Sequence, residues 1–315
     1  MGVKDQLLKR LFMVKEASCS LIGAANYGDG SVIDPESVRF SNPEHISLGI
    51  DDAKNGKRKK NKSVTCDLWL EHEKWNVDYG LELQSYVDYS MSFRLLNEYG
   101  TVFTQAKHTQ PDGTADEKLS KFGKNEKLRK SLITVGFFGT EGPWDAKEKL
   151  SDYWHETDAP EEKNPLDFTP TVFDPWQKSD EELMNLNMMR EVEMLCIGVR
   201  YSHDKKALYE KVVTNPRYDN LNEDLVAIVL HYLNVCDNED RVKAVYLKGG
   251  RSMCKAAEEL HEDWKEEGRT EGRAEGRAEG RAEGRTEERK DMRDKFSSLM
   301  SAGKSSEEIF AALFK

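Results

Sequence analysis

The sequence lacks any apolar run long enough to cross a bilayer, which takes about 20 residues in a helix. Its N-terminus, MGVKDQLLKR, is charged and has no apolar segment of the kind found in signal peptides. Gln6 stands where an N-myristoylation motif has Ser or Thr. We therefore expect a soluble, cytoplasmic protein that has no membrane partner.

Cysteine is also scarce, and its spacing excludes two common uses. The five cysteines are odd in number, widely separated and never arranged as Cys-x-x-Cys; they are Cys19, Cys66, Cys196, Cys236 and Cys254. A disulfide framework or a zinc site would need paired or closely spaced cysteines. The pattern therefore indicates reduced thiols.

An excess of basic residues is absent as well. The 315 residues carry a formal net charge of −11, although 33% of them are charged. This balance excludes a surface that is basic throughout, so any contact with nucleic acid has to be local. The one strongly basic stretch is residues 54–62, KNGKRKKNK, which includes Lys57, Arg58, Lys59 and Lys60. Two interpretations of it stay open, a solvated loop or a loop that contacts DNA phosphates.

Two β-rich runs, residues 64–70 and 77–84, stand out from the polar background. The first is rich in apolar and β-branched residues, and the second partly alternates between polar and apolar residues, as strands do. The polar break between them, residues 71–76, is short enough for a hairpin. The two runs therefore predict adjacent antiparallel strands.

Candidate functional residues lie on one face of this hairpin. Successive side chains of a strand point to opposite faces, so Glu82 and Gln84 share one face while the neighbouring leucines lie on the other. Asp67 on the partner strand can reach the same face as Glu82. Paired carboxylates form an oxygen-rich site suited to Mg²⁺. Exposed strands also carry such residues without binding a metal, so the spacing alone is a weak signal.

The remaining periodicities predict a mixture of helices and strands. Apolar residues at helical spacing indicate helices at residues 4–25, 86–107, 180–201, 204–213, 222–235 and 252–266. The continuous apolar run SLITVGFF, residues 131–138, predicts a buried central strand. Residues 168–176 are a further strand candidate, and residues 144–154 a candidate short helix. The chain is thus expected to form an α/β fold.

Residues 268–287 repeat a four-residue unit, GRTE or GRAE, five times. On a helix, this unit places the Glu and Arg side chains on opposite faces, with Gly on a face between them. The repeat lacks favourable charge pairs four residues apart, and each Gly costs about 1 kcal/mol relative to Ala. The period favours right-handed coiling if two helices pair. A disordered charged linker is the other interpretation.

Helical signals resume after the repeat. Residues 291–302 predict a helix that Gly303 ends. Ser305 and Glu308 have the spacing of a capping box at the start of a second short helix, residues 309–314. We therefore expect a C-terminal pair of helices.

Four stretches of the sequence resemble one bacterial family. They are GLELQ at residues 80–84, YSMSFRLLNEY at residues 89–99, SLITVGFFGTEGPWDAKEKLSDYW at residues 131–154, and SMCKA at residues 252–256, before the repeat. The chain resembles the PD-(D/E)XK nuclease-family transposases, which are related to the recombination-promoting (Rpn-like) nucleases. The likeness extends, with gaps, over nearly the whole length.

The resemblance implies a restriction-endonuclease-like core in which helices flank a mixed sheet. It places this nuclease-like core at residues 1–176 and a helical extension at residues 177–262. The repeat would follow as a long helix or linker at residues 263–290, and the helical pair at residues 291–315.

The resemblance also implies roles for individual residues. Asp67 and Glu82 would bind Mg²⁺, which lowers the pKa of a water so that hydroxide attacks phosphorus. Gln84 would orient that water, and Glu16 on the first helix would hold the metal through water. Arg94 would neutralise phosphate. The wider superfamily usually has Lys where this chain has Gln84, so Gln84 cannot supply that positive charge, although Gln is usual in the subgroup.

Two functions from different classes are consistent with the sequence. The first is a Mg²⁺-dependent DNA endonuclease associated with recombination or mobile elements. The second is a non-catalytic interaction protein that keeps the fold and forms a homo-oligomer through its repeat. The positions of Asp67 and Glu82 discriminate between them, because joint reach of one cation favours the first.

Overall fold

The computed structural model describes residues 2–41, 66–96, 130–153 and 168–303, together with residues 305 and 310. The chain divides into two compact units, Met1–Ala256 and Ala257–Lys315, which are described separately. Within the described residues, no helix combines the length and the apolar character that a membrane crossing requires.

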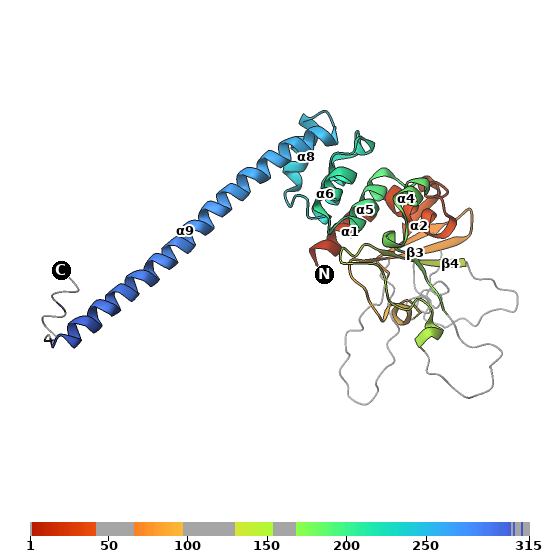
Figure 1. Cartoon of the computed structure of the whole chain (residues 1–315). Coiled ribbons are helices and arrows are strands. Elements are labelled where there is room, and N and C mark those ends of the chain that lie inside the picture. The colour runs from red at the N-terminus through yellow and green to blue at the C-terminus, as the bar shows by residue number, and fades with distance from the viewer. Residues whose placement is uncertain are drawn as a thin grey trace, which may run out of the picture. The chain divides into compact units, whose positions relative to one another are not determined.

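The first unit is built on a five-stranded mixed sheet (Figure 1). Its strands follow chain order and are β1 (Val38–Ser41), β2 (Leu68–His72), β3 (Val77–Gln84), β4 (Lys130–Phe137) and β5 (Thr171–Phe173). The first three strands pair antiparallel, whereas β4 pairs in parallel with both β3 and β5. The predicted α/β class with a mixed sheet is therefore confirmed.

β2 and β3 form the predicted hairpin. At its turn, Asn76 has a φ of 54°, and its N–H donates to the carbonyl of Glu73 at 3.1 Å. Asn adopts this left-handed conformation more readily than most residues, which explains why the chain reverses here. The second predicted strand, residues 77–84, coincides with β3.

The predicted end of the first strand at residue 70 is wrong, because β2 continues to His72. Glu71 stays in the strand because it pairs with Arg39 of β1 and Asp78 of β3 in the sheet, and its carboxylate also lies 2.6 Å from the Arg39 guanidinium. His72 is only 1% exposed, and its ring stacks on Trp75 with centroids 4.2 Å apart. These two polar residues are thus stabilised by neighbours that the local pattern does not reveal.

The N-terminal region contains two helices, α1 (Val3–Phe12) and α2 (Lys15–Tyr27), so the prediction of one helix at residues 4–25 is wrong. Val14 has extended dihedrals, φ −74° and ψ 119°, and interrupts the helix. The hydroxyl of Ser18 donates to the carbonyl of Phe12 at 2.5 Å, which satisfies an acceptor that the break would leave unpaired. The apolar stripe of α1 is buried as expected.

α1 and α2 cover one face of the sheet. Leu21 of α2 lies directly against Gly136 of β4, where an added Cβ would come within 2.9 Å of the leucine side chain. The neighbouring strand positions point to the opposite face, where they form a hydrophobic cluster with the helical residues 91–96. Its buried members are Cys66, Trp69, Met91, Leu95, Ile133, Val135, Phe137, Trp144 and Ala146.

Three further predicted elements differ from the structure in their bounds. The helix predicted from residue 86 begins at residue 91, because Asp88 accepts hydrogen bonds from Ser90 that form a turn. Residues 97–107 of that prediction lie outside the described residues. Instead of a helix at residues 144–154, the structure has one 3-10 turn, Leu150–Tyr153. The last strand is limited to β5, since Asp174 caps the 3-10 turn Pro175–Gln177 that follows it.

The helical extension belongs to the same compact unit as the sheet. Its helices are α4 (Asp180–Asn185), α5 (Arg190–Arg200), α6 (Lys205–Leu208), α7 (Glu223–Tyr232) and α8 (Glu239–Lys248), with a π-helical turn at Tyr209–Val213 and a 3-10 turn at Pro216–Tyr218. The predicted helix at residues 180–201 is divided near Asn187, whose φ is 50°. α8 was not predicted. α7 packs on α1 and on α8, so the helical extension contacts the N-terminal helix through α7.

The last helix, α9 (Met253–Ser301), includes the four-residue repeat. Gly303 follows it with a φ of 71°, and its N–H donates to the carbonyl of Met300 at 3.0 Å. The stability of the repeat as a helix stays a prediction, since its five glycines disfavour the helical state. Glu308 of the expected capping box lies outside the described residues.

Candidate active site

Two acidic residues, Asp67 and Glu82, lie next to each other beside the hairpin. Leu68 of β2 pairs with Leu81 of β3, so Asp67 and Glu82 are neighbours just beyond this pair. The backbone N–H of Asp67 donates to Oε2 of Glu82 at 3.3 Å, and Oδ2 of Asp67 accepts from the N–H of Leu83 at 2.9 Å. The structure thus brings together the two acids that the sequence singled out.

Gln84 fixes the direction of the Glu82 carboxylate. Its Nε2 donates to Oε1 of Glu82 at 2.8 Å, as expected for side chains two positions apart on one strand face. Glu82 is 3% exposed and Gln84 is 5% exposed. Burying a carboxylate is costly unless its oxygens accept hydrogen bonds. Here Oε2 of Glu82 accepts one from Asp67, and Oε1 accepts from both Gln84 and Arg94.

Lys9 is a member of this site that the sequence analysis missed. Its Nζ lies 2.5 Å from Oδ1 of Asp67, and the two side chains are 33% and 16% exposed. Partly buried pairs are screened by salt less than exposed pairs. The only local signal is that Lys9 follows Asp5 by four residues, so the two share a face of α1.

Arg94 connects the acid pair to the segment after β3. Its NH2 group lies 2.7 Å from Oε1 of Glu82, and its NH1 group lies 2.7 Å from Oδ2 of Asp88. Burial favours the neutral form of Asp88, but hydrogen bonds from Ser90 and the Arg94 guanidinium outweigh it and lower the pKa of this carboxyl. Arg94 therefore lies beside the acid pair with its charge shared between two carboxylates, and its role in neutralising phosphate stays a prediction.

A different helical acid from the expected one reaches this end of β3. Asp5 of α1 accepts a hydrogen bond from the hydroxyl of Ser85, the residue after β3, at 2.7 Å. Glu16 instead lies exposed in the first turn of α2. Its charge adds to the burial that raises the pKa of Cys19 to about 12. Among the described residues, Asp5 is thus better placed than Glu16 to act together with Asp67 and Glu82.

The donor set of the site fits Mg²⁺ chemically. Mg²⁺ is typically bound by one or two carboxylates and completes its shell with water and substrate phosphate oxygens. Asp67 and Glu82 supply two adjacent carboxylates. A ready-made cluster of three or more His, Cys, Asp or Glu ligands is absent from the part of the chain that the structure describes. Lys9 and Arg94 already interact with these carboxylates, so a metal ion would compete with both for their oxygens.

The basic stretch that includes Lys57, Arg58, Lys59 and Lys60 lies outside the described residues. Its proposed contact with DNA phosphates stays a prediction.

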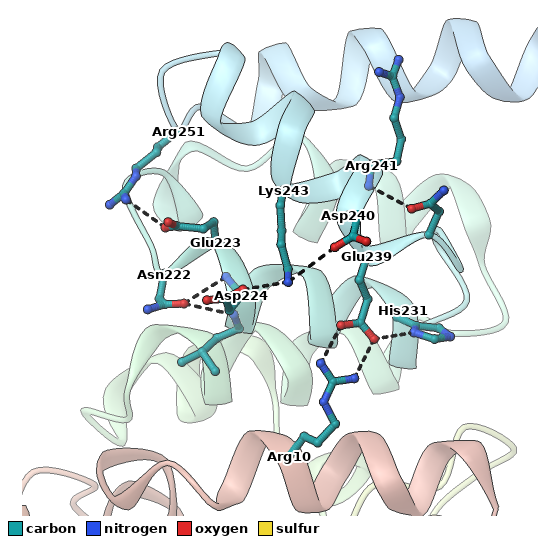
Figure 2. Close-up of polar contacts among 12 residues, drawn as sticks. Arg10, Asn222, Glu223, Asp224, His231, Glu239, Asp240, Arg241, Lys243 and Arg251 are labelled. Atoms are coloured by element: carbon teal, nitrogen blue, oxygen red, sulfur yellow. Dashed lines mark hydrogen bonds and ion pairs between the residues drawn. The ribbon is translucent and has the colours of Figure 1, made fainter.

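A second polar cluster fastens α1 to the helical extension (Figure 2). The Arg10 guanidinium forms a bidentate pair of hydrogen bonds with the Glu239 carboxylate of α8, with nitrogen–oxygen distances of 2.8 and 2.7 Å. His231 of α7 lies 3.0 Å from the same carboxylate. The hydrogen bonds from Arg10, reinforced by His231 against the opposing effect of burial, lower the pKa of Glu239 to about 2.

The same cluster surrounds a surface hollow of about 590 Å³, lined by Arg10, Asp237, Asn238, Glu239, Asp240 and Lys243. Lys243 lies 2.8 Å from Asp224 of α7 and 3.9 Å from Asp240 (Figure 2). Opposite charges thus compensate one another within the hollow. We interpret it as a structural joint that holds α1, the helix that carries Lys9, in position.

Comparisons with protein-family models, with curated proteins and with solved structures gave no significant match. The residues of the site are therefore the basis for assigning a function.

Proposed function

We propose that this protein is a Mg²⁺-dependent DNA endonuclease of the restriction-endonuclease-like type, associated with recombination or mobile elements. The observation that carries the proposal is the contact between Asp67 and Glu82 beside the hairpin, where Gln84 holds Glu82 in place. Two neighbouring carboxylates repel each other, and burying one of them, Glu82, is costly. Their enforced proximity is therefore the feature that most needs a functional explanation.

Asp67 and Glu82 are the residues that would hold the metal ion. When bound, Mg²⁺ supplies a nucleophile by lowering the pKa of a water and stabilises negative charge on the phosphoryl group. Asp5, linked to the end of β3 through Ser85, provides a third carboxylate for hydrogen-bonding water at this position.

The Gln84 side chain is suited to orienting a water molecule or a substrate phosphate at the site. Its amide uses one N–H on Glu82, and an amide has a second N–H and a carbonyl oxygen with which to orient a water or a phosphate oxygen. It cannot supply positive charge, however. Lys9 can, since its ammonium lies 2.5 Å from Asp67 and can stabilise the charge that develops on phosphate oxygens.

DNA contacts beyond the scissile phosphate are assigned to two groups. Arg94 at Glu82 neutralises an adjacent phosphate, and the basic stretch with Lys57 to Lys60 contacts other phosphates of the DNA backbone. Such contacts position the duplex and carry no sequence information directly. The protein is thus expected to bind DNA with little sequence preference.

The test is cleavage of supercoiled plasmid by the purified full-length protein, with and without added Mg²⁺. We expect nicked or linear plasmid only when Mg²⁺ is present, and loss of that activity in the Glu82→Gln variant. Equal cleavage by wild type and variant would identify a contaminating nuclease and contradict the proposal.

A second candidate function is supported by a separate observation. Lys9 and Arg94 neutralise the acid pair in the structure as it stands, which is also what a degenerate, non-catalytic site would show. In that case the protein would act by self-association through the charged repeat of α9. Absence of plasmid cleavage together with concentration-dependent assembly favours this alternative.

A further inference from the structure

An exposed aromatic cluster adjoins the acid pair. Tyr89 and Phe93 are 61% and 48% exposed. The ring of Phe93 meets the ring of Tyr153 edge to face, with centroids 5.0 Å apart and planes at 66°. We call Tyr89, Phe93 and Tyr153 the aromatic platform. Clustered aromatic rings that stay in contact with water are typical of binding surfaces.

Polar contacts hold the platform in a fixed geometry. The Tyr89 hydroxyl donates to Oδ2 of Asp145 at 3.1 Å, and the Tyr153 hydroxyl donates to the Tyr89 carbonyl at 2.7 Å. The Ser92 hydroxyl donates to the carbonyl of Glu148 at 2.8 Å. These bonds join the segment after β3 to the segment after β4. A surface held in this way loses little conformational entropy when it binds a ligand.

Hydrophobic packing beneath the platform adds to this rigidity. Val87, Met91 and Leu95, from the same segment, pack into the hydrophobic cluster on this face of the sheet. Because the inner side chains of the segment already fill the core, Tyr89 and Phe93 are not needed to complete it. Their exposure therefore points to a role outside the fold.

The platform is tied directly to the acid pair. Asp88 precedes Tyr89 in the chain, and Arg94 follows Phe93. The Arg94 guanidinium binds Asp88 and Glu82, each at 2.7 Å. A strand whose phosphodiester lies at Glu82 therefore has the platform within reach of its adjacent nucleotides.

The charges around the platform limit what it can bind. Among the described residues, Asp145 and Asp152 are exposed at its border, and Lys147 lies over a platform ring, with its Nζ 5.3 Å from the Tyr153 centroid. Apart from Arg94, which is paired with Asp88 and Glu82, these charges are of mixed sign and offer little attraction to an anionic membrane. Aromatic faces, in contrast, stack on any nucleobase, since every base has a π-face.

We propose that the aromatic platform stacks an unpaired nucleobase, so that the preferred substrate class is DNA with single-stranded nucleotides beside the cleaved bond. The inference rests on the proposed nuclease function for the placement of the strand. Bases paired within a duplex present only their edges in the grooves, whereas the bases of a single strand expose their faces to the platform. Affinity for a single strand then depends on Tyr89 and Phe93, and affinity for duplex does not.

The test compares binding of a fluorescent oligothymidylate and of a duplex of equal length by the full-length protein in EDTA, measured by anisotropy. We expect the Tyr89→Ala, Phe93→Ala double variant to bind the single strand roughly 5- to 100-fold more weakly. Its affinity for duplex is expected to change less than about twofold, with an unchanged dependence on salt, because no phosphate contact is removed.

Two control variants make the result specific. Tyr89→Phe keeps the ring and loses only the hydrogen bond to Asp145, so it should lose much less affinity for the single strand than Tyr89→Ala. Trp75→Ala removes an aromatic side chain of similar exposure, 41%, from the far end of β3 and should leave binding unchanged. Thermal unfolding of each variant confirms that the fold is retained.

Each other outcome has a distinct meaning. If the double variant loses affinity equally for single strand and duplex, or loses it for neither, the proposed role of the platform is wrong. Platform-dependent binding without plasmid cleavage supports the platform and contradicts the nuclease. If the double variant cleaves plasmid and binds the single strand as the wild type does, the base-stacking proposal is wrong and the nuclease proposal is not affected. A wild-type protein that binds neither DNA overturns both proposals.

Discussion

The ammonium of Lys9 and the carboxylate of Asp67 lie 2.5 Å apart and join the first helix of the chain to the residue before β2. The contact places a positive charge beside the acid pair, where Gln84 supplies none. Positive charge therefore reaches the site from α1. The helix is held on its other side by Arg10, which binds Glu239 of α8.

The first prediction concerns this ammonium. Replacing Lys9 with Gln is expected to lower the kcat for plasmid cleavage by roughly 100-fold, the effect of removing one group that stabilises transition-state charge. KM should change little, and Lys9→Arg should restore part of the rate because it keeps the charge. Initial rates at saturating Mg²⁺ provide the measurement. Lys74→Gln, at the exposed hairpin turn, is the matched control. If the Lys9→Gln variant has the wild-type kcat, Lys9 has no role in catalysis and its ion pair with Asp67 serves stability alone.

The second prediction separates Glu82 from Gln84. Glu82→Gln keeps the size of the side chain and removes its charge, so cleavage should be abolished. Gln84→Ala removes only the bond that directs Glu82 and should slow cleavage. Folding is expected to survive in both, since Arg94 retains its contact with Asp88. Circular dichroism and plasmid cleavage are measured on the same preparations. Full activity of Glu82→Gln would remove this residue from the site.

The sequence could predict the strand that carries the site because strand geometry is local. Alternation alone puts Glu82 and Gln84 on one face, and the short polar break predicts the hairpin that brings Asp67 near. The same reasoning fails where long-range contacts decide. Lys9 and Asp5 reach the site only because α1 packs beside β3, and nothing in their local sequence specifies that packing.

Helix boundaries were missed for a related reason. Apolar periodicity continues from α1 into α2, but the break at Val14 is stabilised by the hydroxyl of Ser18, which binds the carbonyl of Phe12. α8 was missed because its exposed face carries many charges. It is held by a few buried residues, such as Val242 and Val245, and by the contact of Glu239 with Arg10. Such contacts between distant segments leave no periodic signal.

The third prediction is a pH dependence. Arg10 and His231 lower the pKa of Glu239 from 4.5 to about 2. The ionised form is thus favoured in the folded state, and its stabilisation is complete above pH 4.5 and is lost as the pH falls towards 2. Because Arg10 is half exposed, solvent screens the pair, and we expect the Glu239 carboxylate to add only about 1–2 kcal/mol to the free energy of unfolding at neutral pH.

Urea unfolding of the wild type and of Glu239→Gln between pH 2 and pH 7 measures this contribution. The difference in unfolding free energy should shrink across the acidic window. Asp240→Asn, whose side chain is 99% exposed, is the control and should show almost no difference. A difference for Glu239→Gln that stays constant from pH 7 to pH 2 would show that the carboxylate charge is not the cause.

The fourth prediction concerns the basic loop. Replacing Lys57, Arg58, Lys59 and Lys60 with Gln should weaken DNA binding for all sequences alike. The dependence of affinity on salt should also become shallower, because fewer counterions are released from the phosphates. Titrations at several salt concentrations measure the slope. An unchanged slope would identify the loop as solvated surface.

The last prediction concerns the repeat of residues 268–287 and the alternative function. On a helix, the four-residue period would place the Glu and Arg side chains in stripes on opposite faces, and the glycines on a face between them that would let a second backbone approach. Two such helices can set a Glu stripe against an Arg stripe at short distance. A single helix bears the glycine cost, about 4–5 kcal/mol over the five positions, without this compensation. Helix formation and self-association should therefore occur together.

Circular dichroism and sedimentation of a peptide covering residues 264–296 test this coupling as concentration and salt vary. Helicity should rise with concentration and fall at high salt, which screens the paired stripes. In the full-length protein, changing Arg269, Arg273 and Arg277 to Glu should abolish assembly, whereas changing them to Lys should retain it because the charge pattern is kept. A peptide that stays monomeric and unstructured at high concentration and low salt would make the repeat a flexible linker. If the full-length protein self-associates but does not cleave plasmid, the result favours the alternative function, a non-catalytic interaction protein that assembles through the repeat.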